Sequence, residues 1–265
     1  MPISNNSLNL TLVKRATLFL LPIGIVLWVI PCEKIPFLWL NSRLVEWAGV
    51  TFWALLTNLG DGFFLFPLAM LLVKNNPKRQ QALIITIILA ALVLNAGKYI
   101  VDTTRPLGVF GDKLVTVVGP EVKSHSMPSG HAGTIFILAG LTILFANKWV
   151  ALLVLGLSTL IALSRVAVGA HFLVDVVAGA WIGLVCASVG EMLSKRCEVG
   201  FLIRAFFVFL GFIPAFLLPF YDNGFQDIVF VQILQYILAV LSLILSVAEL
   251  NTLVRDYSAK RKEKT

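Results

Sequence analysis

Residues 81–101 read QALIITIILAALVLNAGKYIV, a run in which Lys98 is the only formal charge. About 20 apolar residues in a helix cross the ~30 Å hydrocarbon core of a bilayer, so this run predicts a transmembrane helix. Comparable runs recur along the chain at about 16–30, 52–73, 132–147, 149–164, 172–192, 201–220 and 228–248. The sequence therefore predicts an all-α fold, a polytopic transmembrane helical bundle of about eight spans.

The composition supports a membrane protein and excludes other classes. Hydrophobic residues make up 58% of the 265 residues and charged residues only 13%, whereas soluble domains carry about 25% charged residues. The net charge of +7 does not indicate a nucleic-acid partner, because the basic residues lie at the ends of the apolar runs. The three cysteines, Cys32, Cys186 and Cys197, show neither a disulfide framework nor a metal-ligand spacing.

No linker or low-complexity tract divides the chain, so residues 1–265 are expected to form a single domain. The run at 16–30 is short enough to be the core of a signal peptide. Pro31-Cys32 follows it in place of a small-residue cleavage site, and we interpret it as an uncleaved span. Residues 34–50, which contain two tryptophans, are expected to form an interfacial connector.

The distribution of Lys and Arg predicts the orientation of the bundle. Eight spans that start from a cytoplasmic N-terminus place 14 of the 21 basic residues on the cytoplasmic side, as the positive-inside rule requires. The C-terminus is then cytoplasmic too. Three polar clusters, at 98–106, 128–131 and 164–175, all fall on the opposite side of the membrane.

The first cluster holds Lys98 and Arg105, followed by Pro106. If the helix continues to Arg105, the two cations share one face, and Pro106 then ends the helix. A lysine point charge and a planar arginine fork suit phosphate oxygens. Two cations that snorkel to the interface are the alternative interpretation.

The second cluster, Pro128-Ser129-Gly130-His131, precedes an apolar run. Ser129 can cap that helix, and Gly130 allows close approach of the backbone. The free N–H groups of the helix start would then bind an anion, with His131 in the first turn facing the same site. An ordinary capped helix with an interfacial histidine is the alternative.

The third cluster holds Ser164-Arg165, His171 and Asp175. Asp175 follows His171 at i+4, so the two are expected on one helical face. A carboxylate there fixes the imidazole tautomer and raises the basicity of the other ring nitrogen, as in an oriented nucleophile or base. A structural His–Asp pair is the alternative, but a carboxylate in a membrane helix is a functional candidate by default.

Together, Lys98-(six residues)-Arg105-Pro106, Pro128-Ser129-Gly130-His131 and Ser164-Arg165-(five residues)-His171-(three residues)-Asp175 resemble the three-part signature of the type 2 phosphatidic acid phosphatase (PAP2) superfamily. That superfamily contains membrane lipid phosphatases, glucose-6-phosphatase-like enzymes and soluble vanadium haloperoxidases. The resemblance implies a six-helix phosphatase core at about 50–192. Additional C-terminal spans and a basic cytoplasmic tail are then expected in 193–265.

The resemblance also implies the roles of the matching residues. His171 would attack phosphorus to form a phosphohistidine, Asp175 would hold its ring, and His131 would protonate the leaving oxygen and later activate water. The phosphoryl oxygens would be bound by Lys98, Arg105, Arg165, Ser129 and the Gly130 amide. Such enzymes need no metal or other cofactor. Two further residues are secondary candidates on their position alone. Asp61 would support the pocket or touch the substrate, with pairing to a polar neighbour as the favoured alternative, and His125 would be a loop histidine near the head group.

The apolar setting indicates a substrate anchored in the same bilayer. Candidates are phosphatidylglycerol phosphate, phosphatidic acid, undecaprenyl diphosphate and the phosphates of lipid A, with no obligate protein partner. Short loops suggest a bacterial cytoplasmic (inner) membrane with the active site facing the periplasm, and an endoplasmic reticulum membrane with a lumenal site is the alternative. A lipid-to-lipid phosphotransferase with a polyprenyl diphosphate donor would use the same residues. A phosphate transporter is disfavoured, because no paired repeat with broken helices is visible.

Overall fold

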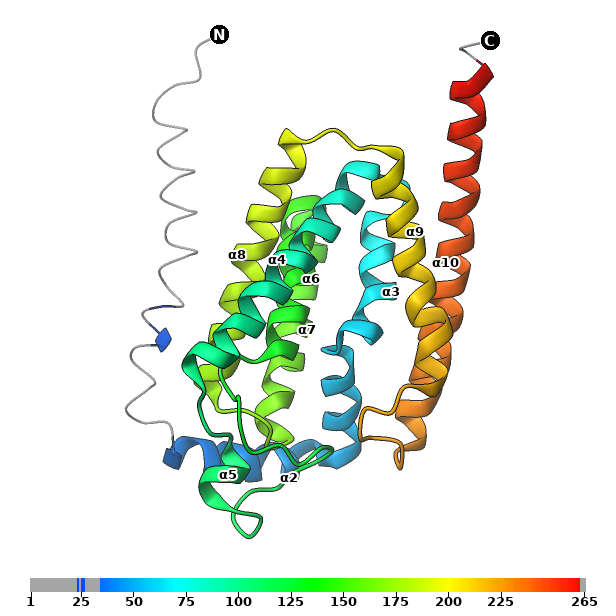
Figure 1. Ribbon diagram of the computed structural model, residues 1–265. Coiled ribbons are helices and arrows are strands. Elements are labelled where there is room, and N and C mark those ends of the chain that lie inside the picture. Colours follow the sequence, from blue (N-terminus) through cyan, green and yellow to red (C-terminus); the bar gives the residue numbers. More distant parts are fainter. Residues whose placement is uncertain (1–22, 24, 27–33, 263–265) are drawn as a thin grey trace, which may run out of the picture.

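The computed structural model describes residues 23, 25, 26 and 34–262, and this part of the chain contains helices and no strand (Figure 1). The helices are α2 (Lys34–Leu59), α3 (Gly62–Val73), α4 (Pro77–Val101), α5 (Pro106–Phe110), α6 (Gly130–Phe145), α7 (Lys148–Ala167), α8 (Leu173–Arg196), α9 (Phe201–Leu217) and α10 (Val229–Lys262), with a 3-10 turn, η2 (Leu218–Phe220), after α9. The predicted all-α class is confirmed.

The described residues account for only part of the predicted count of membrane crossings. Five helices of the described part are long and apolar enough to cross a bilayer, or six if α2 and α3 form one bent span. α6 is apolar but has only 16 residues. The expected span at 16–30 lies almost wholly outside the described residues, so the total of eight stays a prediction.

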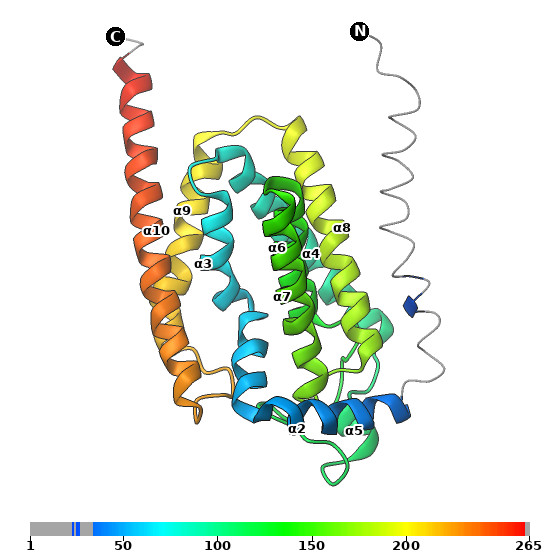
Figure 2. The ribbon, with the colours of Figure 1, turned by 180° about the vertical axis from the view of Figure 1, so that it is seen from behind.

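α6 lies in the middle of the bundle and packs on α8, α7 and α4 (Figures 1 and 2). Its contact with α8 depends on glycine, because a Cβ on Gly179 would lie 2.2 Å from the carbonyl oxygen of Ser129. A Cβ on Gly183 would lie 2.3 Å from the carbonyl oxygen of Gly133. With no side chain at these positions the two backbones approach closely, which places the start of α6 beside the start of α8.

α2 runs across one end of the bundle before turning into it (Figure 2). Gly49, at φ 77°, breaks the helix at the turn, a conformation that glycine adopts without strain. Trp39 and Trp47 in the crossing part are largely exposed, as expected of an interfacial connector. The expected single span at 52–73 is wrong in detail: α2 ends at Leu59, and α3 continues at an angle of 60° after a break at Gly60-Asp61.

α9 and α10 form a hairpin that packs on α3, at the edge of the bundle (Figure 1). Its attachment at the α3–α4 turn is polar. The buried Glu249 of α10 accepts hydrogen bonds from the backbone N–H of Asn75 at 2.7 Å and from the side chain of Gln80 at 2.8 Å. Paired in this way, the carboxylate fixes α10 against the core.

Candidate phosphate-binding active site

The second sequence cluster forms the start of α6 as expected. Ser129 is the N-cap and its hydroxyl accepts from the N–H of Ala132 at 3.4 Å. The N–H of Ser129 donates to the carbonyl oxygen of Asp175 at 2.9 Å, which ties the start of α6 to α8. Gly130 and His131 occupy the first turn, where N–H groups and the helix dipole favour an anion.

The His171–Asp175 pair exists, but not on one helical face. α8 begins at Leu173, so His171 lies in the connection before it, and the Asp175 carboxylate turns back to accept from the N–H of Phe172 at 2.9 Å. His171 Nδ1 lies 3.5 Å from Asp175 Oδ2. With Nδ1 on the Asp175 side, the other ring nitrogen, Nε2, is free to react.

Ser126 is a member of this group that the sequence analysis missed. Its buried hydroxyl donates to Asp175 Oδ2 at 2.5 Å and lies 3.4 Å from His171 Nδ1. It therefore holds the same carboxylate oxygen that accepts from the N–H of Phe172. Ser126 lies in the loop before the second cluster, and only its position two residues before Pro128 hinted at it.

Arg165 lies in the last turn of α7 with 8% of its surface exposed. Its Nη1 donates to the hydroxyl of Thr57 on α2, a second residue that sequence reasoning did not find. Its Nε is buried and has no hydrogen-bond acceptor among the residues that the structure describes. A buried guanidinium N–H without an acceptor is costly, and an anion bound beside it would remove that cost.

Lys98 and Arg105 do not belong to one continuous helix. α4 ends at Val101, Asp102 adopts a left-handed conformation at φ 38°, and Arg105 precedes the short helix α5. The prediction that Pro106 ends a helix is therefore wrong: it starts α5, because its fixed φ suits a first helical position. Arg105 Nε donates to the carbonyl oxygen of Ser124 at 2.9 Å, so the loop rather than the helix positions it.

Lys98 and Arg105 nevertheless lie close to Arg165 and the two histidines. Lys98 Nζ lies 3.7 Å from where a Cβ of Gly130 would be. His171, which lies between α7 and α8, is almost fully buried, and burial, with the charges of Arg165, Arg105 and Lys98, holds its pKa well below the usual value. The same three cations and His171 are the charged neighbours of His131. The structure thus brings all three sequence clusters together at one end of the bundle.

The two secondary candidates, Asp61 and His125, lie in different surroundings. Asp61 caps α3 by accepting from the N–H of Phe63 at 2.8 Å, and it accepts a hydrogen bond from Tyr221 at 3.1 Å. Burial and then the charge of Asp61 raise the pKa of Tyr221 to about 12. His125 lies at the outer edge, 3.0 Å from the carboxylate of Asp102.

The chemistry of the site favours an anion over a metal ion. Among the described residues, no three His, Cys, Asp or Glu side chains gather as metal ligands would. Cations and helix N–H groups surround the two histidines instead, the arrangement that binds a phosphoryl group.

Fold and site together define an integral membrane protein with histidines and cations gathered at one end of a helical bundle. Residues 81–194, which contain all three clusters, match the model of the PAP2 superfamily. This segment of the chain is therefore similar to the PAP2 superfamily.

Three known proteins show how far the similarity extends. The chain is 29% identical over 130 residues to an undecaprenyl-diphosphatase of Sulfolobus acidocaldarius, over 48% of this chain and 62% of that protein. It is 27% identical over 176 residues to the lipid A 1-diphosphate synthase of Escherichia coli, over 60% of this chain and 74% of that protein. The crystal structure of Aquifex aeolicus LpxE matches 60% of this chain and 94% of its own, with a TM-score of 0.53 and 26% identity. The chain thus spans less than two thirds of the archaeal relative.

Proposed function

We propose that this protein is a membrane lipid phosphatase that removes a phosphoryl group from a lipid phosphate or diphosphate without a metal ion. The observation that carries the proposal is the buried Arg165 Nε, which lacks an acceptor in the described chain and lies near Lys98, Arg105 and two histidines. Three cations gathered around two histidines favour an anion, and a phosphoryl group supplies one.

In the first step, a ring nitrogen of His171 attacks phosphorus while the bond from phosphorus to the lipid oxygen breaks. Asp175, held by Ser126 and the Phe172 N–H, orients the ring. His131 gives its proton to the departing lipid oxygen. A phosphohistidine and a lipid with a free hydroxyl, or with one phosphate fewer, result.

In the second step, water attacks the phosphohistidine and gives a proton to His131, and the N–P bond breaks to release inorganic phosphate. Lys98, Arg105, Arg165, the Ser129 hydroxyl and the Gly130 amide bind the equatorial oxygens in both steps. Charge spreads over those oxygens in the transition state, so donors fixed by folding stabilise it without reorganisation.

The substrate class follows from the setting of the site among apolar helices. Phosphatidylglycerol phosphate, phosphatidic acid, undecaprenyl diphosphate and lipid A phosphates remain the candidates. The name undecaprenyl-diphosphatase, printed for one relative, supports a diphosphate. We place the protein in a bacterial inner membrane with the site on the periplasmic face and both termini in the cytoplasm, as the distribution of Lys and Arg favours.

A lipid-to-lipid phosphotransferase is the second candidate, favoured by the name lipid A 1-diphosphate synthase of another relative. Such an enzyme would form the same phosphohistidine and pass the phosphoryl group to a lipid acceptor instead of water. Comparing release of free phosphate with formation of a phosphorylated acceptor, with undecaprenyl diphosphate as donor and lipid A as acceptor, separates the two.

The test is purified protein in detergent with a panel of the four lipid classes and EDTA present, followed by free phosphate. We expect phosphate release that survives chelation and falls at least about 1,000-fold in His171→Ala. His125→Ala is the matched control, because this half-exposed histidine lies outside the proposed machinery, and it should stay within about threefold of wild type. A requirement for Mg²⁺, or a fully active His171→Ala, would contradict the mechanism.

A further inference from the structure

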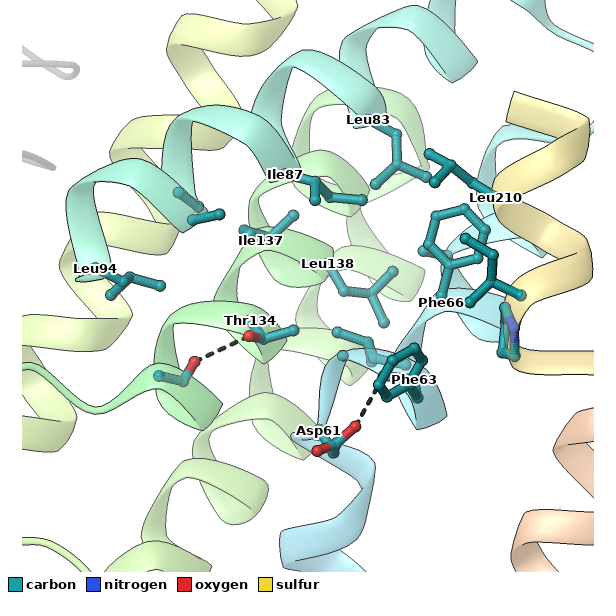
Figure 3. Close-up of a pocket in the computed structure, with 18 of the residues that line it drawn as sticks. Asp61, Phe63, Phe66, Leu83, Ile87, Leu94, Thr134, Ile137, Leu138 and Leu210 are labelled. Carbon is teal, nitrogen blue, oxygen red and sulfur yellow. Dashed lines mark hydrogen bonds between the residues drawn. The ribbon is translucent and has the colours of Figure 1, made fainter. Parts of the chain in front are cut away.

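A cavity of about 450 Å³ lies between α3, α4, α6 and α9 (Figure 3). Its polar lining includes Asp61, Tyr221 and Lys98, and Figure 3 shows Asp61 at one end, far from Leu83. The rest of the wall is mainly aliphatic and aromatic, with Phe66 and Leu210 among its members. The cavity is therefore amphipathic, as a lipid is.

The cavity is continuous with the candidate active site. Lys98 and Gly130 line it and also belong to the phosphate-binding cluster. Along α4, its lining extends from Lys98 to Leu83, which is about 22 Å at the helical rise. The whole hydrocarbon core is about 30 Å thick, so the cavity is long enough for a substantial part of a lipid chain.

The outer wall comes from the C-terminal hairpin. Leu210, Ile213 and Pro214 of α9 face α4 across the cavity, and Tyr221 follows at its polar end. In Figure 1, α4 and α9 are close at the end where α4 begins and diverge toward the site. These α9 residues lie beyond the segment 81–194 that matches the superfamily model.

We propose that this cavity holds one hydrocarbon chain of the lipid substrate, and that α9 makes the protein selective for that chain. The inference rests on the proposed function and deepens it. A phosphate bound at Lys98 and Gly130 places its lipid at the polar end of the cavity, and the apolar path that starts there runs between α4 and α9. Burying the chain in this path contributes binding energy in proportion to its apolar area.

The kinetic test compares chain lengths on one head group. Leu210→Trp fills the cavity, and we expect it to lower kcat/KM at least tenfold for the panel lipid that wild type hydrolyses fastest. The same head group on a chain of about four carbons should change less than threefold. Leu202→Trp is the matched control, since Leu202 lies on the same helix with 79% exposure. Ala91→Phe fills the cavity from α4 and should reproduce Leu210→Trp.

Equal effects on long and short chains, or no effect of either filling variant, would overturn the inference while leaving the proposed function intact.

A second readout does not depend on turnover. The His171→Ala variant is incubated with phosphatidic acid or with a polyprenyl phosphate, each carrying a diazirine midway along its chain. After crosslinking by light, the labelled residues are mapped by mass spectrometry. We expect labels on α4 and α9 that Leu210→Trp reduces at least fivefold, and the probe that labels more strongly identifies an acyl or prenyl chain. Labels that Leu210→Trp leaves unchanged would refute the inference, and wild-type inactivity on the whole panel would instead refute the proposed function.

Discussion

The polar residues of the site differ in burial in a way that suits their proposed tasks. His171, Asp175 and Arg165 are buried, whereas Lys98, Arg105 and His131 are only partly covered. Ser126 and the N–H of Phe172 donate hydrogen bonds to Asp175, and Arg165 donates one to the hydroxyl of Thr57. A nucleophile must be held in a fixed orientation, which suits the buried, hydrogen-bonded residues. The residues that meet an entering phosphate must be accessible, which suits the partly covered ones.

Ser126→Ala tests the role of the serine that the sequence analysis missed. A buried hydrogen bond to a charged group is worth about 1.5–3 kcal/mol, so we expect kcat to fall about 10- to 150-fold. KM should change little, because Ser126 contacts Asp175 and His171 rather than phosphate. Ser124→Ala, at an exposed position in the same loop, is the control. A kcat within threefold of wild type would show that Phe172 alone suffices to hold the carboxylate.

The pKa of His171 predicts the acid side of the pH profile. A group whose pKa is lowered stays neutral until the pH falls below that lowered value, so kcat/KM should not drop as the pH passes 6.5. Lys98→Met removes one of the charges that lower the pKa, and the acid limb should then move to higher pH. Lys113→Met, in an exposed loop, should leave the limb in place. The measurement is kcat/KM between pH 4 and 9. An acid limb that Lys98→Met does not move would contradict the assignment of that limb to His171.

At the scale of elements, the site depends on how closely two helices approach. α6 and α8 start side by side because Gly179 and Gly183 leave room for the backbone of α6. The Ser129 N–H to Asp175 carbonyl hydrogen bond then links the two helix starts. The second and third clusters thus meet through backbone packing.

Gly179→Ala tests this packing. Its Cβ would lie 2.2 Å from the Ser129 carbonyl oxygen, so α8 must shift, and overpacking of this kind costs about 1–3 kcal/mol. We expect a lower midpoint of thermal unfolding in detergent and at least a tenfold loss of activity, because the shift separates His171 from His131. Gly156→Ala in α7 is the control, with no atom within 4 Å of the new Cβ. Full activity in Gly179→Ala would show that the site tolerates movement of α8.

At the scale of the whole molecule, the three clusters meet at one end of the bundle, and the α9–α10 hairpin closes one side. The hydrogen bond from the Tyr221 hydroxyl to the Asp61 carboxylate joins that hairpin to the break between α2 and α3. The opposite end carries the α8–α9 connection with the exposed Cys197. The two ends can therefore be distinguished chemically.

Labelling of single cysteines tests the proposed orientation. With Cys32 and Cys186 replaced by serine, Cys197 should react with a membrane-impermeant maleimide only in inside-out vesicles. Lys113→Cys, made with Cys197 also replaced, should react only in right-side-out vesicles, because residue 113 lies in the loop at the site end. The reverse pattern would place the site in the cytoplasm, and labelling of both from one side would contradict the number of crossings between them.

The membrane class and the three clusters could be predicted from the sequence alone, because long apolar runs and costly charges within them are local properties of the chain. The sequence also indicated the cap at Ser129, since a helix start depends on a few consecutive residues. The domain limits and the roles of His171 and His131 stay predictions.

How the clusters meet depends on the way the helices pack in three dimensions. Ser126, Thr57 and Tyr221 come from segments far from their partners in the sequence, and no local pattern marks them. Asp61 caps α3 and Asp102 ends α4 in a left-handed conformation, so each interrupts a helix that the apolar pattern predicts to continue. Contacts between distant segments depend on how whole helices pack, and that information is not contained in any single stretch of the chain.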